Sequence, residues 1–178
     1  MYNRILVPLD GSELAECSLE HVKEVALGCH VPEVVLLAVA EPIEGSMPSF
    51  WGAVAGNQTQ MEAGKDTATT AVADFKQMTS EQQNAEIEKR QRVLADDYLC
   101  RVAERLAGEG LNVTTAVLYG KAAETIIDFA GKNEIDLIIM TTHRRGDSAR
   151  WDIGKVADKV IRGSNTPVLM AAPVGCRL

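Results

Sequence analysis

Basic side chains gather in one stretch near the C-terminal end of the chain. Arg144, Arg145, Arg150 and Lys155 lie close together there. Guanidinium and ammonium groups bind phosphates and carboxylates, Arg through a planar fork and Lys as a point charge. The cluster indicates an anion site; the alternative is that Arg144, Arg145 and Arg150 are solvated loop charges.

A polar turn, Asp10-Gly11-Ser12, directly follows an apolar segment at 4–9. Asp and Ser both accept hydrogen bonds from the first backbone amides of a helix, so either side chain is expected to cap a helix that starts here. Glu13 adds a favourable negative charge to its first turn. On this evidence alone, Asp10 is a turn-forming and capping residue.

Side-chain catalysis finds little support in the sequence. The chain has no GxxxxGK[ST] phosphate loop and no GxGxxG, HExxH or GxSxG motif. The histidines, His21, His30 and His143, have no metal-ligand spacing, and the four cysteines form no CxxC pair. We therefore expect no catalytic residue, no metal site and four free thiols.

Strand and helix patterns alternate along the chain. Continuous apolar runs predict strands at 4–9, 33–40, 136–140 and 167–171, and an alternating run predicts an edge strand at 113–118. Helical periodicity predicts helices at 14–28, 80–106, 122–129 and 153–162. This alternation indicates a doubly wound five-stranded parallel α/β sheet of order 3-2-1-4-5. Ligands bind such sheets where the strand order reverses, here between the loops at 10–12 and 141–147.

Length and charge set the wider limits. The 178 residues fit a single domain, 1–178, with a long insert or loop at about 43–85 and a short helix expected near 67–75. A net charge of −7 argues against non-specific binding to nucleic acid or to an anionic membrane. The apolar runs are too short to span a bilayer, and residues 1–7 do not resemble a signal peptide, so we expect a cytoplasmic protein.

Five motifs in order resemble those of the universal stress protein family. They are Ile5-Leu6-Val7-Pro8-Leu9-Asp10-Gly11-Ser12, the apolar run 34–39, Gly120-Lys121-Ala122-Ala123-Glu124-Thr125-Ile126-Ile127, the segment 136–144, and Gly154 followed by 160–161 and 164–169. The resemblance covers most of the chain apart from the insert. It implies a Rossmann-like fold of the adenine nucleotide alpha-hydrolase type.

The same resemblance implies a nucleotide site. Nucleotide-binding members carry G-x2-G-x9-G-[ST] after the fourth strand, and this chain has Thr141, Arg144, Gly154 and Lys155 at those positions. Asp10 would contact the nucleoside and Val39 would line the base pocket. The implied ligand-binding residues are Pro8, Leu9, Asp10, Val39, Met140, Thr141, Thr142, His143, Arg144, Gly154, Lys155 and Val156.

Thr141 and Arg144 thus replace two of the family's glycines. Without glycine at these positions, the backbone cannot approach a phosphate as closely. We expect a non-catalytic stress-response module with a degenerate nucleotide site. The alternative is a sensor of ATP or AMP, with Mg if ATP is bound and with at most slow hydrolysis. A third class, an adenylyl-transferring enzyme, rests on fold analogy alone. The family commonly pairs through its last strand, so a homodimer through 168–171 is also expected.

Overall fold

The computed structural model describes residues 2–40, 80–142 and 153–172. Its element order is β1 (Arg4–Pro8), α1 (Glu13–Glu16), α2 (Ser18–Gly28), β2 (Glu33–Ala40), α5 (Ser80–Gly108), β3 (Val113–Tyr119), α6 (Ala122–Lys132), β4 (Leu137–Thr141), α7 (Lys155–Gly163) and β5 (Val168–Ala171). The short helix expected near 67–75 lies outside the described residues.

The five strands form one parallel sheet of order β3-β2-β1-β4-β5. The predicted topology is therefore confirmed, and the alternating strand β3 does lie at an edge. The three inner strands are buried almost throughout, because helices cover both faces. This explains why their sequences are continuous apolar runs.

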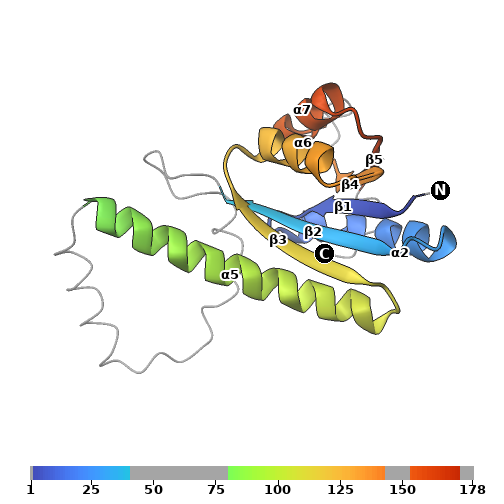
Figure 1. Cartoon of the computed structure of the whole chain (residues 1–178), viewed down its shortest axis with the longest axis horizontal. Coiled ribbons are helices and arrows are strands. Elements are labelled where there is room, and N and C mark those ends of the chain that lie inside the picture. The colour runs from blue at the N-terminus through green and yellow to red at the C-terminus, as the bar shows by residue number, and fades with distance from the viewer. Residues whose placement is uncertain (1, 41–79, 143–152, 173–178) are drawn as a thin grey trace.

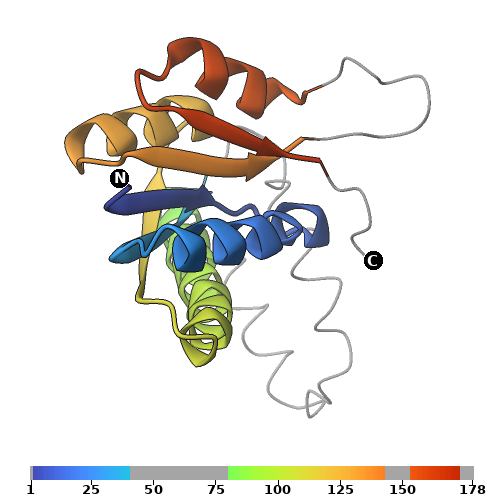
Figure 2. The same cartoon turned by 90° about the vertical axis from the view of Figure 1, so that its right-hand side faces the viewer.

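Helices cover the two faces of the sheet in pairs, as Figures 1 and 2 show. On one face α2 and α5 pack over Ile5, Val7 and Leu36. On the other face α6 and α7 pack over Leu6 and Ile138. Alternate residues of each strand thus enter opposite cores, as the two-residue period of a strand requires.

The first predicted helix, 14–28, is two helices in the structure. Cys17 separates α1 from α2, and its N–H group bonds to the carbonyls of Ala15 and Leu14 rather than continuing the helix. Neither glycine nor proline marks this break. Cys29 and Cys100 are free thiols. Cys17 is in a disulfide whose partner lies outside the described residues, so the expectation of four free thiols is wrong. Pairing depends on distances in the fold, which sequence spacing does not give.

The strands are fastened together at their amino ends by a group of polar contacts that we call the amino-edge clamp: Arg4, Glu33 and Asp136. Arg4 bonds to Glu33 through Nε at 2.7 Å and Nη2 at 2.6 Å. Asp136 Oδ2 accepts the backbone N–H groups of Asn3 and Arg4 at 2.6 and 3.0 Å, which holds the pKa of that carboxyl below its usual range. The clamp joins β1 to β2 and to the start of β4.

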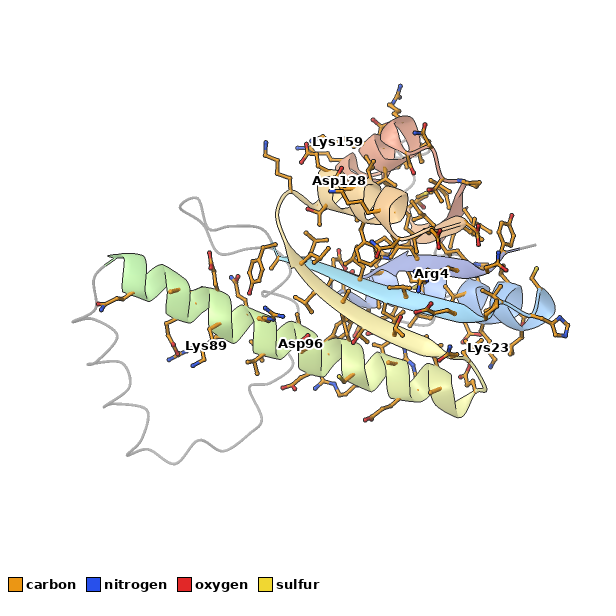
Figure 3. The ribbon with its side chains drawn as sticks, in the orientation of Figure 1. Arg4, Lys23, Lys89, Asp96, Asp128 and Lys159 are labelled. Atoms are coloured by element: carbon orange, nitrogen blue, oxygen red, sulfur yellow. The ribbon has the colours of Figure 1, made fainter. Side chains whose placement is uncertain are left out.

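Among the described helices, none combines the length and apolar character that crossing a bilayer would require. The polar ends of Lys89, Asp96, Asp128 and Lys159 lie on the outer surfaces of α5, α6 and α7 in Figure 3.

Candidate functional site

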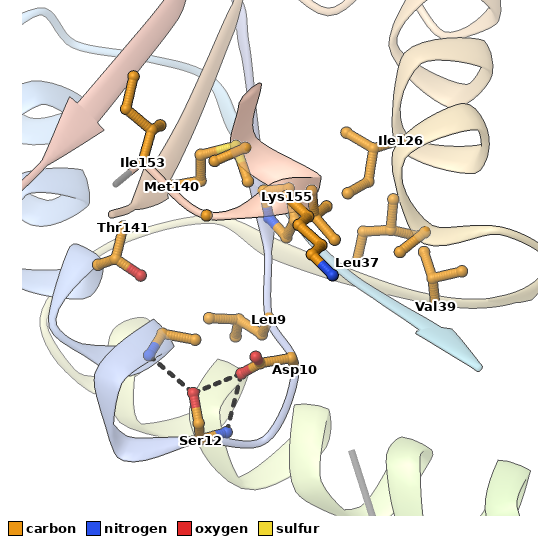
Figure 4. A pocket seen from close by; sticks show the side chains of 16 residues that line it. Leu9, Asp10, Ser12, Leu37, Val39, Ile126, Met140, Thr141, Ile153 and Lys155 are labelled. Carbon is orange, nitrogen blue, oxygen red and sulfur yellow. Dashed lines mark hydrogen bonds between the residues drawn. The ribbon is translucent and has the colours of Figure 1, made fainter. Parts of the chain in front are cut away.

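A pocket of about 640 Å³ opens at the carboxyl edge of the sheet, where the strand order reverses between β1 and β4 (Figure 4). Its volume lies within the range of about 300–1,000 Å³ that is usual for small-molecule sites. Six elements (β1, α1, β2, α6, β4 and α7) and their loops supply its lining: Pro8, Leu9, Asp10, Ser12, Ala15, Leu37, Val39, Ala122, Ile126, Met140, Thr141, Ile153, Gly154, Lys155, Val156 and Ala157.

One side of the pocket is apolar. Leu37 and Val39 project from the same face of β2, and Ile126 of α6, Met140 of β4 and Ala157 of α7 complete this side. Leu37 is fully buried, Ile126 is 3% exposed and Ala157 is 4% exposed, so this wall is set firmly in the core. A flat apolar group such as an aromatic ring fits it chemically.

Asp10 lies at the pocket's rim in the turn after β1 (Figure 4). Its Oδ1 accepts the Ser12 amide at 3.0 Å and the Ser12 hydroxyl at 2.5 Å. The same hydroxyl accepts the Ala15 amide at 3.1 Å and so caps α1. Ser12 is therefore the helix cap, and Asp10 holds the cap. The second oxygen of Asp10 makes no hydrogen bond with the described residues, so it is available to a ligand hydroxyl.

Lys155 faces Asp10 from α7, on another wall of the pocket. It is the first residue of α7, whose N-cap is Gly154. Gly154 has φ +91° and ψ 143°, a conformation that residues with a Cβ rarely adopt. The ammonium group and the positive end of the helix dipole therefore favour an anion at the same place.

The pocket therefore combines an acceptor at one end, a cation at a helix start and an apolar wall between α6 and β2. Within the described segments, no three His, Cys, Asp or Glu side chains come together in a way that could hold a metal ion. Among the described residues, the lining includes no His, Glu or Cys. The combination of cation, acceptor and apolar wall suits binding of an amphipathic anion.

The family model for the "Universal stress protein family" matches residues 1–172. The chain belongs to this family. The resemblance stated from its five motifs is thereby confirmed over nearly the whole sequence.

Two relatives come from Methanocaldococcus jannaschii. Universal stress protein MJ0577 is 28% identical over 96% of this chain and 94% of its own length, and universal stress protein MJ0531 is 25% identical over 96% of this chain and 82% of its own. The solved structure of MJ0577 superimposes with a TM-score of 0.65, covering 97% and 96% of the two chains at 26% identity. Universal stress protein UspA from Lactobacillus plantarum shares the fold, with a TM-score of 0.65 at 20% identity over 95% and 97% of the chains.

Most residues that the universal stress resemblance implies for a ligand line the pocket: Pro8, Leu9, Asp10, Val39, Met140, Thr141, Gly154, Lys155 and Val156. Thr142 does not, because it continues past β4 and its N–H group donates to Ala171 of β5 at 3.1 Å. His143 and Arg144 lie outside the described residues, as do Arg145 and Arg150. The anion cluster predicted from the sequence is thus represented in the described residues by Lys155.

Sequence reasoning missed the contribution of α6. Ala122 and Ile126, four residues apart on one helix face, line the pocket together with Leu37. Leu37 has a signal in the sequence, since it lies two residues before Val39 and therefore on the same face of β2. The α6 residues belong to the motif at 120–127, but nothing in that motif links them to the pocket, because only the packing of the helix brings them to the sheet edge.

Proposed function

We propose that this universal stress protein binds a nucleotide without catalysing its conversion. The pocket carries the proposal, because it brings an apolar wall, the free oxygen of Asp10 and the ammonium group of Lys155 around one cavity. The base would pack between Val39 and Ile126, and Asp10 would accept a ribose hydroxyl. Lys155 and the first turn of α7 would bind the phosphate.

The family adds support of a more general kind. One solved member, which shares the fold with a TM-score of 0.55 at 13% identity, is a universal stress protein in complex with cAMP. A cyclic or linear nucleoside monophosphate carries its charge near the sugar. Lys155 replaces the family's small hydroxyl residue. Its single positive charge at the start of α7 suits the compact negative charge of a monophosphate.

The contacts of the hydroxyl and titratable side chains in the pocket support the proposal that no turnover occurs. Proton transfer needs a titratable side chain within hydrogen-bond reach of the reacting atom. The hydroxyl of Ser12 is already engaged, since it donates to Asp10 and accepts from Ala15. Thr141 and Lys155 are the other described lining residues with a hydroxyl or amine, and neither is hydrogen-bonded to a base within the described part of the chain.

A thermal-shift titration tests the proposal. ATP, ADP, AMP and cyclic nucleotides are added to the full chain, with and without magnesium, and the released products are assayed. Binding to the folded state at a hundredfold excess over Kd stabilises it by about 2.7 kcal/mol. For a chain of this size that is about 5–10 °C in Tm.

Two variants sharpen the test. Asp10→Ala removes the proposed hydroxyl acceptor and is expected to abolish the shift. Asp128→Ala removes a carboxylate on the outside of α6, where it pairs with Lys132 at 3.1 Å, and is expected to leave the shift intact. A flat response of the wild type to every nucleotide refutes the proposal, and steady product release refutes its non-catalytic part.

We also propose a homodimer through β5. This strand forms one edge of the sheet, and Val168, Leu169 and Met170 are only half-buried there. An apolar edge strand with unpaired backbone groups is a template for pairing with a second copy. Light scattering after size exclusion at micromolar concentration is expected to give twice the chain mass, and a monomer refutes the dimer.

A further inference from the structure

α1 is tied to α5 by an ion pair outside the pocket. Arg105 Nη2 of α5 donates to Glu16 Oε2 at 2.8 Å, between residues 89 positions apart in the sequence. Glu16 is the last residue of α1, which is a single turn. Figures 2 and 4 show α5 running beside α1 and α2 on the same face of the sheet. Arg105 thus holds the far end of a very short helix.

That short helix is bonded to the Asp10 turn at its other end. The Glu16 amide donates to the Ser12 carbonyl at 3.3 Å, and the Ala15 amide donates to the Ser12 hydroxyl at 3.1 Å. Ser12 in turn donates its hydroxyl to Asp10 at 2.5 Å. Because one turn of helix separates Glu16 from Ser12, α1 cannot shift without moving Ser12 and the carboxylate that Ser12 holds.

Tyr98 places a second group of α5 at the same point. It lies two helical turns before Arg105, on the same side of the helix, and its side chain is buried. Burial raises the pKa of its phenol, and the carboxylates of Glu16 and then Asp10 raise it further. Tyr98 belongs to the same buried cluster as Leu9 and Ala15, the residues on either side of the Asp10 turn, so α5 packs close to that turn.

We propose that Arg105 is a positioning residue for the ligand site: through Glu16 it fixes α1 and thereby the orientation of Asp10. This rests on the proposed function, in which Asp10 accepts a ligand hydroxyl. Arg105 itself does not line the pocket. Its effect on binding comes from holding Asp10 in place before the ligand arrives, so that less order has to be created on binding.

The structure offers a matched control for a merely structural ion pair. Lys23 of α2 pairs with Glu109, the residue after α5, at 2.9 Å. This pair therefore also connects an early helix, α2, to the end of α5. Lys23 is labelled in Figure 3. The side chains are similarly accessible, 34% and 35% exposed against 52% and 28% for Arg105 and Glu16. It differs in contacting α2 instead of α1.

The experiment compares Arg105→Met with Lys23→Met in the full chain. Solvent exchange of the Ala15 amide is measured by NMR without ligand, and Kd for AMP and ATP by calorimetry. An exposed ion pair is worth up to about fivefold in an equilibrium. Arg105→Met is therefore expected to speed Ala15 exchange and weaken binding about two- to fivefold. Lys23→Met is expected to lower Tm by a similar amount, but to change neither the exchange rate of the Ala15 amide nor Kd.

A charge-swap double variant tests whether the effect of Arg105→Met comes from losing the ion pair that positions α1 or from losing the charge of Arg105. The double variant Glu16→Arg with Arg105→Glu restores an ion pair of reversed polarity, and it is expected to recover slow Ala15 exchange. Equal Ala15 exchange in Arg105→Met and wild type overturns the positioning role. If the wild type binds no nucleotide, the proposed function fails, and the exchange measurement still decides whether Arg105 orders the turn.

Discussion

Asp10→Asn separates the two roles that the sequence left open for this residue. Asparagine keeps an oxygen at the position of Oδ1, so it still accepts the amide and hydroxyl of Ser12 at the observed distances of 3.0 and 2.5 Å. The cap on α1 is retained, and the free energy of unfolding is expected to change by less than about 0.5 kcal/mol. What changes is the charge presented to the pocket.

The effect on binding follows from the second oxygen. A hydrogen bond to a charged acceptor contributes about 1.5–3 kcal/mol. Asp10 is exposed at the rim, so the lower end applies, and about 1.4 kcal/mol corresponds to a tenfold rise in Kd. Calorimetric titration with AMP measures Kd, and urea unfolding measures stability in the same preparations.

Ser12→Ala is the matched variant. It removes the cap itself and is expected to destabilise the fold by about 1 kcal/mol. The reasoning is refuted if Asp10→Asn lowers stability as much as Ser12→Ala does while Kd is unchanged. In that case Asp10 is a turn-forming residue and the ligand contact lies elsewhere.

Three further predictions concern stability. The pKa of Asp136 is lowered, so its contribution to stability is full above the unfolded pKa near 4 and is lost as pH falls through the folded value. In urea unfolding, Asp136→Asn should therefore destabilise the fold more at pH 6 than at pH 2. Gly120→Ala should lower the free energy of unfolding by about 1–3 kcal/mol, because Gly120 has φ +146° and a Cβ would lie 2.6 Å from Thr125 Oγ1. The double variant with Thr125→Ala should recover only the part of this loss that is due to the contact with Thr125. Ile138→Ala should cost about 2–5 kcal/mol, since Ile138 is fully buried, whereas Val93→Ala at 53% exposure should cost less than about 0.5 kcal/mol, and equal losses would contradict the assigned core.

The sheet could be predicted because its strands are buried on both faces. Segment 33–40 is too short for a core helix and rich in β-branched residues, so the sequence favours a buried strand there. Helix ends were harder. The helix expected from 153 begins at Lys155, since Gly154 adopts φ +91° and serves as its N-cap. A glycine at this position is visible in the sequence, but the sequence does not say that it adopts a positive φ.

The site was predictable only in part, for a similar reason. Asp10 follows β1, Val39 lies near the carboxyl end of β2 and Gly154 caps α7, so topology places them at one edge of the sheet. Ile126 comes from the docking of α6, and the pairing of Arg105 with Glu16 comes from the docking of α5 across 89 positions. Neither contact leaves a local pattern. Both depend on how whole helices sit against the sheet.

The amino-edge clamp has a consequence for how this chain tolerates change. Arg4, Glu33 and Asp136 hold β1, β2 and β4 together at their amino ends. The pocket lies at the carboxyl ends, about 16 Å away along a five-residue strand. These contacts hold the strands together far from the pocket. Thr141, the last residue of β4, and Lys155, the first residue of α7, stand at the pocket end where the family's signature has glycine and a small hydroxyl residue. A fold divided in this way can acquire a new ligand preference by mutational drift at one edge while it inherits its stability from the other.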